Sequence, residues 1–198
     1  MYLSLMKNDY SNSIIVVCKS KNPFGKFSYA ATLQDQSQTG IADTIDPFVV
    51  WGEDNKLYMF YGSTNGIHRI ELEEDGLSVK ENASPIHVAG LSISQDPTRE
   101  KVFEGSSLFY FNDYWYFLVS SGNYYDNTYK LKIGRSKTIT GTFKDKDGNN
   151  MVDGYGTVIL ETETDNKDVY NGPAHCSRAF VGKDGKIVGN CSSSDSEV

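Results

Sequence analysis

The sequence predicts an all-β protein of the propeller type, because short strands recur in repeated units and helical periodicity is nearly absent. No stretch of twelve residues keeps apolar side chains at the spacing of an amphipathic helix. Four strand-rich units follow one another, and each has a first strand, a turn and a second strand. Their connections differ in length, which favours propeller blades over a tight solenoid.

The first two units occupy the N-terminal part of the chain. In the first unit a β-branched, apolar run at residues 13–18 predicts a buried strand, and the Asn22-Pro23-Phe24-Gly25 turn leads to an outer strand. The polar segment 34–40 crosses to the second unit, which begins at Asp46. The strands that we expect in this second unit are residues 48–51, 56–61 and 67–72.

The third unit begins with Glu104, directly before an aromatic-rich strand. The preceding segment, 81–100, is polar, and its two prolines predict that it contains no regular element. A turn at Asn112-Asp113 and two more strands follow Glu104, and the fourth unit begins with Gly172-Pro173-Ala174-His175. The first strands of propeller blades meet at one end of a central channel, so we expect Asp46, Glu104 and His175 to converge.

Composition limits the class of protein. At 198 residues the chain is long enough for one domain, and we treat residues 1–198 as a single partial propeller domain with a catalytic role. The net charge of −7 and the lack of a basic stripe exclude nucleic acid and anionic membranes as expected partners. The sequence contains no apolar run of membrane-spanning length and no signal peptide, so no membrane association is expected.

Two carboxylates in one polar pocket match the chemistry of glycosidic bond cleavage. One carboxyl group arrives protonated and donates to the leaving oxygen, and an ionised one activates water. A third carboxylate nearby holds the pKa of the acid high by charge repulsion. Each residue alone also has a structural interpretation: Asp46 before Pro47 as a turn residue, Glu104 as a solvated strand edge, and His175 as a half-buried imidazole.

Aromatic residues make up 13% of the chain and supply flat apolar faces on which sugar rings stack. The Tyr124-Tyr125-Asp126 segment is either such a sugar platform or an exposed loop. We name Trp51, Ser106, Tyr124 and Tyr125 as candidate substrate-binding residues. The segment Asp145-Lys146-Asp147-Gly148-Asn149 resembles a calcium loop, but its glycine is misplaced and a hairpin turn is expected.

Six motifs in order resemble the family 43 glycoside hydrolases, and in particular their arabinanase-like members. The resemblance covers nearly the whole chain and implies a five-bladed β-propeller, here incomplete and comprising roughly blades two to four. The tract 134–157 is the part most similar to arabinan-acting enzymes. The motifs are Ser13–Ser20 with Asn22–Gly25, Ile45–Phe48, Tyr58–Ser63 with Gly66-Ile67, Phe103–Ser106, Gly134–Asp145 and Gly172–His175.

The resemblance also implies roles for individual residues. Glu104 matches the general acid of the family, and Asp46 matches the aspartate that modulates the pKa of the acid and orients it. His175 matches the histidine near the channel centre that, in arabinanase-like members, helps to bind a calcium or other ion, directly or through water. Glu104 is followed by Gly105 and Ser106 where many members have Ala-Pro, and Ala174 replaces a frequent glycine, which puts the shape of the subsites in question.

The family pattern places the general base, an aspartate in a His-Asp-Pro-like motif, ahead of every motif in this chain. Asp9 lies in a turn and does not match it. We therefore expect a chain truncated at both ends that lacks the general base and is inactive or very weak alone. We also expect an oligomer or a partner chain to cover the missing blades.

The resemblance implies an inverting glycoside hydrolase that acts on the α-L-arabinofuranosyl linkages of arabinan, a plant cell-wall polysaccharide. The full-length form is expected to be secreted or periplasmic. Two alternatives stay open from the sequence. One is a β-xylosidase or α-L-arabinofuranosidase that acts on xylan, and the other is a non-catalytic carbohydrate-binding remnant.

Overall fold

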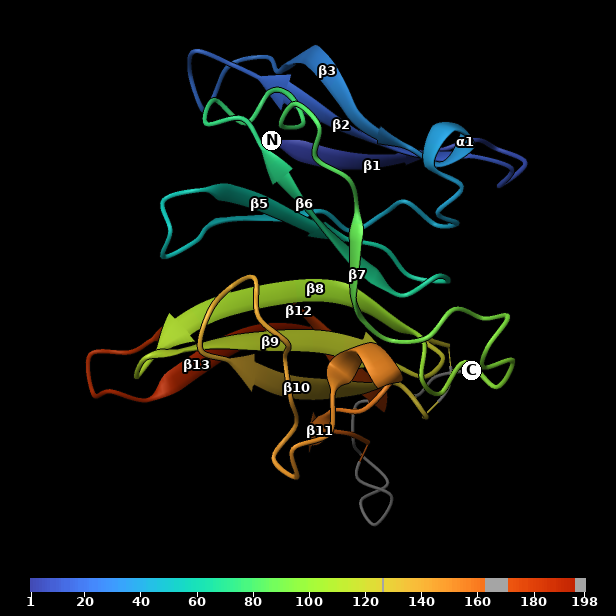
Figure 1. Cartoon of the computed structure of the whole chain (residues 1–198), viewed down its shortest axis with the longest axis vertical. Coiled ribbons are helices and arrows are strands. Elements are labelled where there is room, and N and C mark those ends of the chain that lie inside the picture. The colour runs from blue at the N-terminus through green and yellow to red at the C-terminus, as the bar shows by residue number, and fades with distance from the viewer. Residues whose placement is uncertain (126, 163–170, 195–198) are drawn as a thin grey trace.

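Four antiparallel sheets follow one another along the chain, as the blades of a β-propeller do (Figure 1). The computed structural model describes residues 1–125, 127–162 and 171–194. The first sheet has three strands in the order β1-β2-β3, and the short helix α1 (Gln36–Thr39) follows it. Its strands are β1 (Tyr2–Met6), β2 (Ser13–Lys19) and β3 (Ser28–Asp35).

The second and third sheets have four strands each, and in both the strands follow the order of the chain from one edge to the other. The second sheet consists of β4 (Phe48–Trp51), β5 (Leu57–Tyr61), β6 (Ile67–Leu72) and β7 (Ile86–Ala89). The third consists of β8 (Phe103–Phe111), β9 (Tyr114–Ser121), β10 (Lys130–Ser136) and β11 (Thr157–Leu160).

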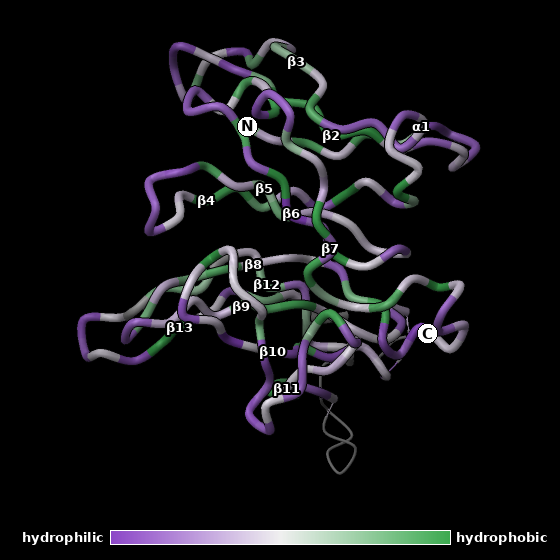
Figure 2. Tube along the Cα trace, viewed as in Figure 1, coloured by the Kyte–Doolittle hydropathy of each residue, from purple (hydrophilic) through white to green (hydrophobic). Residues whose placement is uncertain are grey.

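The fourth sheet is a two-stranded ribbon, and its first strand packs on β8 of the third sheet. It consists of β12 (Asn171–Val181) and β13 (Ile187–Ser194). Hydrophilic residues gather at the turns that join the strands of all four sheets (Figure 2). Within the described residues, no helix has the length and apolar character that crossing a membrane requires.

The sheets stack face to face, so that the inner ones are buried on both faces. In β5, Leu57, Met59 and Tyr61 face the first sheet, while Tyr58 and Phe60 face the third. Successive side chains of a strand point to opposite faces, so a strand covered on both sides is apolar at every position. The continuous run Leu57–Tyr61, all of it buried, therefore results from stacking of blades.

Two predictions about local structure have clear outcomes. The segment 81–100 does contain a regular element, β7, so the prediction from its prolines was wrong. Pro85 lies just before the first residue of this edge strand, where the lack of an N–H costs no ladder hydrogen bond. The segment 145–149 is a turn closed by hydrogen bonds between Asp145 and Asn149, as expected.

Candidate active site

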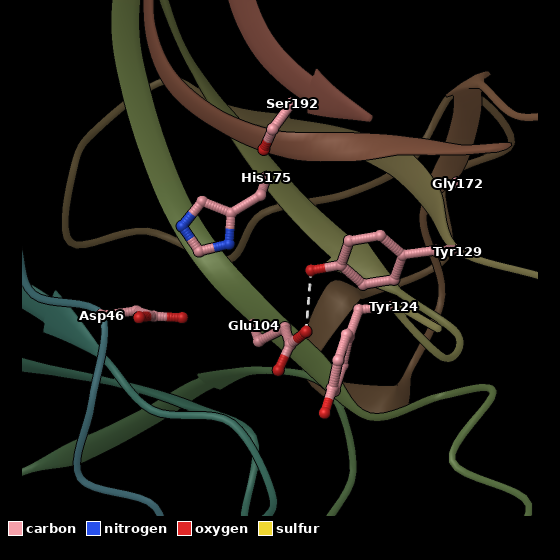
Figure 3. A pocket seen from close by; sticks show the side chains of 7 residues that line it. All are labelled: Asp46, Glu104, Tyr124, Tyr129, Gly172, His175 and Ser192. Atoms are coloured by element: carbon pink, nitrogen blue, oxygen red, sulfur yellow. Dashed lines mark hydrogen bonds between the residues drawn. The ribbon is translucent and has the colours of Figure 1, made fainter. Parts of the chain in front are cut away.

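Residues from five separate segments of the chain line a cavity of about 370 Å³ at the end of the molecule where β8 and β12 begin. Asp46, Glu104 and His175, which the sequence predicted to converge, all lie in this cavity (Figure 3). Convergence is a result of the propeller geometry, because each of these residues lies at or near the start of the first strand of its sheet. The cavity is also lined by Tyr124, Tyr129, Gly172 and Ser192.

Both oxygens of the Glu104 carboxylate accept a hydrogen bond from a hydroxyl group. Ser63 Oγ donates to Oε2 over 2.9 Å, and the Tyr129 hydroxyl donates to Oε1 over 2.7 Å (Figure 3). Ser63 follows β5 of the second sheet and Tyr129 precedes β10 of the third. The carboxylate is thus oriented from two sheets and still faces the cavity.

A β-bulge places Glu104 in this position. The pairing of β8 with β9 shifts between Glu104 and Ser107, and Gly105 inside the bulge has a φ of 62°. A Cβ atom on Gly105 would lie 3.0 Å from His175 Nδ1 and 3.2 Å from Ser120 Oγ. Glycine is required here both by the backbone conformation and by the close approach of His175.

Asp46 lies two residues before β4 and also has a left-handed backbone, with a φ of 54°. Its N–H donates to Ser4 Oγ over 2.9 Å, and its carboxylate accepts the N–H of Gly105. Burial raises the pKa of Asp46, and the negative charge of Glu104 raises it further, while His175 acts in the opposite direction. Asp46 is thus a partly desolvated carboxylate that is hydrogen-bonded to the backbone of Gly105, the residue next to Glu104.

Replacement of Asp46 by Asn is expected to stabilise the fold at neutral pH. The folded-state pKa of Asp46 is raised above its unfolded value, so ionisation penalises the native state as the pH rises above about 4. The asparagine has no such penalty and can still accept from Gly105. In thermal unfolding from pH 3 to pH 8, the unfolding temperature of Asp46→Asn should be higher than that of the parent at pH 7. The difference between the two unfolding temperatures should disappear at acidic pH.

The exposed Asp147→Asn variant is the matched control, and its unfolding temperature should stay close to that of the parent. An Asp46→Asn protein that is less stable than the parent at pH 7 would show that the attraction to His175 outweighs burial.

His175 is connected to Glu104 through the third sheet. Its backbone, with a φ of 49°, donates N–H to Ser120 Oγ over 2.7 Å. The side chain of Ser120 is also hydrogen-bonded to Tyr129, whose hydroxyl donates to Glu104. Ser120 therefore links His175 on β12 to Tyr129, the residue that orients Glu104.

The described residues do not form a cluster of acidic, histidine or cysteine side chains around a metal position. Nowhere among them do three or more His, Cys, Asp or Glu side chains gather in a way that could hold a metal ion. Calcium takes six to eight oxygen ligands, and an imidazole is not one of them. His175 alone does not make a calcium site.

The predicted substrate-binding residues differ in their positions. Tyr124 lines the cavity. Tyr125 does not line it, but its ring packs edge-on against the Tyr124 ring with 5.3 Å between the ring centres. Trp51 does not line it either: Trp51 is the last residue of β4, three strand positions or about 10 Å beyond Phe48. Ser106 is buried within the bulge, and among the described residues its Oγ has no hydrogen-bond partner.

Several residues of the site were missed by the sequence analysis. Tyr129 and Ser120 lie in no motif, and Ser63 ends the Tyr58–Ser63 motif without a role having been expected for it; all three reach Glu104 or His175 only through strand pairing and sheet stacking. Asp43 is a further half-buried carboxylate, held by the Thr64 hydroxyl. Burial raises the pKa of Asp43, and Glu104 raises it further against the effect of Arg99.

Comparisons with known proteins agree with this geometry. The family model "Glycosyl hydrolases family 43" matches residues 1–186. The extracellular endo-α-(1→5)-L-arabinanase 1 of Bacillus subtilis is 32% identical over 155 residues, which cover 73% of this chain and 46% of the relative. A probable arabinan endo-1,5-α-L-arabinosidase B of Aspergillus fumigatus is 28% identical over 188 residues, or 79% of this chain and 50% of the relative.

Among solved structures, the fold is similar to that of the α-L-arabinanase of Cellvibrio cellulosa in complex with arabinohexaose. The TM-score is 0.77 at 23% identity, and the match covers 98% of this chain and 64% of that one. The chain spans about half the length of the curated relatives it matches. On the match over residues 1–186, the chain belongs to family 43 of the glycosyl hydrolases.

Proposed function

We propose that this protein takes part in the hydrolysis of α-L-arabinofuranosyl linkages in arabinan, with inversion of configuration, and that Glu104 is the general acid. The observation that carries the proposal is the orientation of the Glu104 carboxylate by Ser63 and Tyr129 in one cavity with Asp46 and His175. The relatives named as arabinanases support arabinan as the substrate. The Tyr124 ring at the mouth of the cavity is suited to stacking against a sugar.

In the proposed step, Glu104 donates its proton to the glycosidic oxygen as the bond from this oxygen to the anomeric carbon breaks. Asp46 is proposed as the second acid, which orients Glu104 through the Gly105 amide and modulates its protonation. Water attacks the anomeric carbon from the opposite side and must lose a proton to a base. We assign this base to none of the described carboxylates.

The other properties of the whole protein are proposals as well. A secreted or periplasmic location is supported by the extracellular relative from Bacillus subtilis. A partner chain or a second copy beside the first sheet is supported by β1, an edge strand on which Leu5 and Met6 are exposed. Calcium beside His175 stays a proposal of the resemblance. No step of the proposed reaction is assigned to the ion.

The test uses an added nucleophile, azide, in place of the water that a general base would have to activate. Azide at high concentration replaces water as the nucleophile and needs no base, so Glu104 alone can complete the cleavage. With an arabino-oligosaccharide and azide, we expect a β-configured arabinofuranosyl azide, detected by NMR, and faster loss of substrate than without azide.

The outcomes separate the candidate functions. Turnover of aryl xylosides in preference to arabinosides would favour the xylan-acting alternative. Binding of arabino-oligosaccharides in calorimetry without any turnover, with or without azide, would contradict the catalytic proposal and favour a carbohydrate-binding module.

A further inference from the structure

A groove lined by cations lies at the end of the third sheet that is opposite to the cavity of Glu104. Its positively charged residues are Arg135, Lys137, Lys144 and Lys146, and all four side chains are exposed. Within the described part of the chain none of the four forms an ion pair. In a protein with a net charge of −7, a groove with four neighbouring cations and a single carboxylate, that of Asp145, is a local feature that composition does not predict.

The groove consists of two adjoining cavities of about 290 and 340 Å³. Arg135, Lys144 and Lys146 line both, so that cations run along the whole groove. Tyr116 and Ile133 add an apolar side to the first cavity. The groove thus presents an apolar surface next to positive charge.

Aromatic rings hold parts of this groove in place. Arg135 Cζ lies 4.4 Å and Lys137 Nζ 3.9 Å from the centre of the Tyr114 ring. The Tyr116 ring stacks on Phe109 at 5.1 Å and an interplanar angle of 9°. Cation–π contacts restrict the two flexible side chains, which lowers the entropy that a ligand must remove.

The groove is separate from the candidate active site. Glu104 pairs with Ser120 of β9, whereas Arg135 pairs with Tyr116 of the same strand. These two levels of the sheet are four residue steps apart along β9, or about 13 Å. A ligand in the groove therefore leaves the cavity of Glu104 open.

We propose that this groove binds a carboxylate-bearing polysaccharide, that is, a chain of uronic acid residues. A uronic acid ring has an apolar C–H face for the side formed by Tyr116 and Ile133, and a carboxylate for Arg135 and the lysines. Asp145 also lines both cavities, and its carboxylate accepts the N–H groups of Asp147 and Asn149. Its carboxylate can accept hydrogen bonds from the hydroxyl groups that a uronic acid chain carries on every ring, whereas its negative charge opposes a polycarboxylate and a phosphodiester alike.

Binding at the groove would keep the protein on an acidic polysaccharide while the cavity of Glu104 engages another part of the same polysaccharide. The inference does not depend on the proposed hydrolysis, because it concerns binding at a separate surface.

The experiment measures binding of a decameric oligogalacturonate to the full chain by calorimetry at low salt. We expect binding that weakens with added salt and with methyl esterification of the ligand, because both remove charge attraction. The double variant Lys144→Gln with Lys146→Gln should bind about tenfold more weakly or worse, since two charge-assisted contacts are lost.

A second basic groove provides the matched control. Lys19, Lys21 and Lys26 line a cavity at the hairpin between β2 and β3 that has no aromatic lining. The double variant Lys21→Gln with Lys26→Gln changes the net charge equally and should keep the parental affinity. Equal losses in both double variants, equal binding of the methyl ester, or equal binding of single-stranded DNA of matched charge would each overturn the proposal.

Discussion

Replacement of Glu104 by Gln is expected to lower the azide-dependent cleavage of arabino-oligosaccharides by about 10²- to 10⁴-fold, the usual contribution of a general acid. Glutamine keeps the size of the side chain and can accept one of the two hydroxyl hydrogen bonds while its NH2 group donates to the other hydroxyl, but it has no acidic proton for the leaving oxygen. Binding of the oligosaccharide in calorimetry should therefore stay within a few-fold of the parent.

The leaving group distinguishes acid catalysis from a structural role. A dinitrophenolate leaves without protonation, so Glu104→Gln should cleave a dinitrophenyl arabinofuranoside far closer to the parental rate. Glu74→Gln, at an exposed position in the turn that follows β6, is the matched control and should behave like the parent on both substrates. Equal losses on the oligosaccharide and the activated arabinoside would mean that Glu104 is not the acid.

The strand-rich units could be predicted because their information is local. Turn residues such as Asn112 and Asp113 separate β8 from β9 where the sequence indicates, and apolar runs such as Leu57–Tyr61 mark the buried strands. Asp46, Glu104 and His175 could be selected because they lie near strand starts and carry side chains with acid–base chemistry.

The rest of the site depends on strand register. Counting back from the turn at Asn112-Asp113 pairs Ser107 with Leu118, as observed, and continued without a break it would pair Glu104 with Ser121. The bulge at Gly105 shifts the pairing, so that Glu104 lies opposite Ser120 instead. A glycine in a strand can mark a bulge, a bend or a close approach of another backbone, so the sequence does not show that the register shifts at Gly105. The contact between Ser120 and Tyr129 could therefore not be deduced from the sequence.

Trp51 illustrates the opposite error. Its aromatic side chain made it a candidate for sugar binding, but β4 runs away from the cavity after Asp46, so the same strand carries Trp51 to its far end. Residue type alone suggested binding, while position along the strand decides which end of the blade a side chain reaches.

Phe117→Ala is expected to be the most destabilising substitution that we consider, at about 3–5 kcal/mol. Phe117 is fully buried on β9, and its ring contacts Phe60 of the second sheet at 5.4 Å and Phe143 at 5.1 Å, both edge-on. Its removal leaves a cavity between the second and third sheets, which carry Ser63 and Glu104 respectively. Chemical denaturation should show the loss, and thermal unfolding should fall by about 6–20 °C.

A phenylalanine-to-alanine substitution at an exposed position, where no side chains pack against the ring, is the matched control. Phe24 is 99% exposed in the hairpin between β2 and β3, so Phe24→Ala should leave the free energy of unfolding within about 0.5 kcal/mol of the parent. Phe117→Leu should lose less than Phe117→Ala because it refills part of the cavity. The same core positions Ser63 on one side and Glu104 on the other, so Phe117→Ala should also weaken arabino-oligosaccharide binding. A loss no larger than that of Phe24→Ala would show that stacking of these two sheets does not depend on the aromatic cluster.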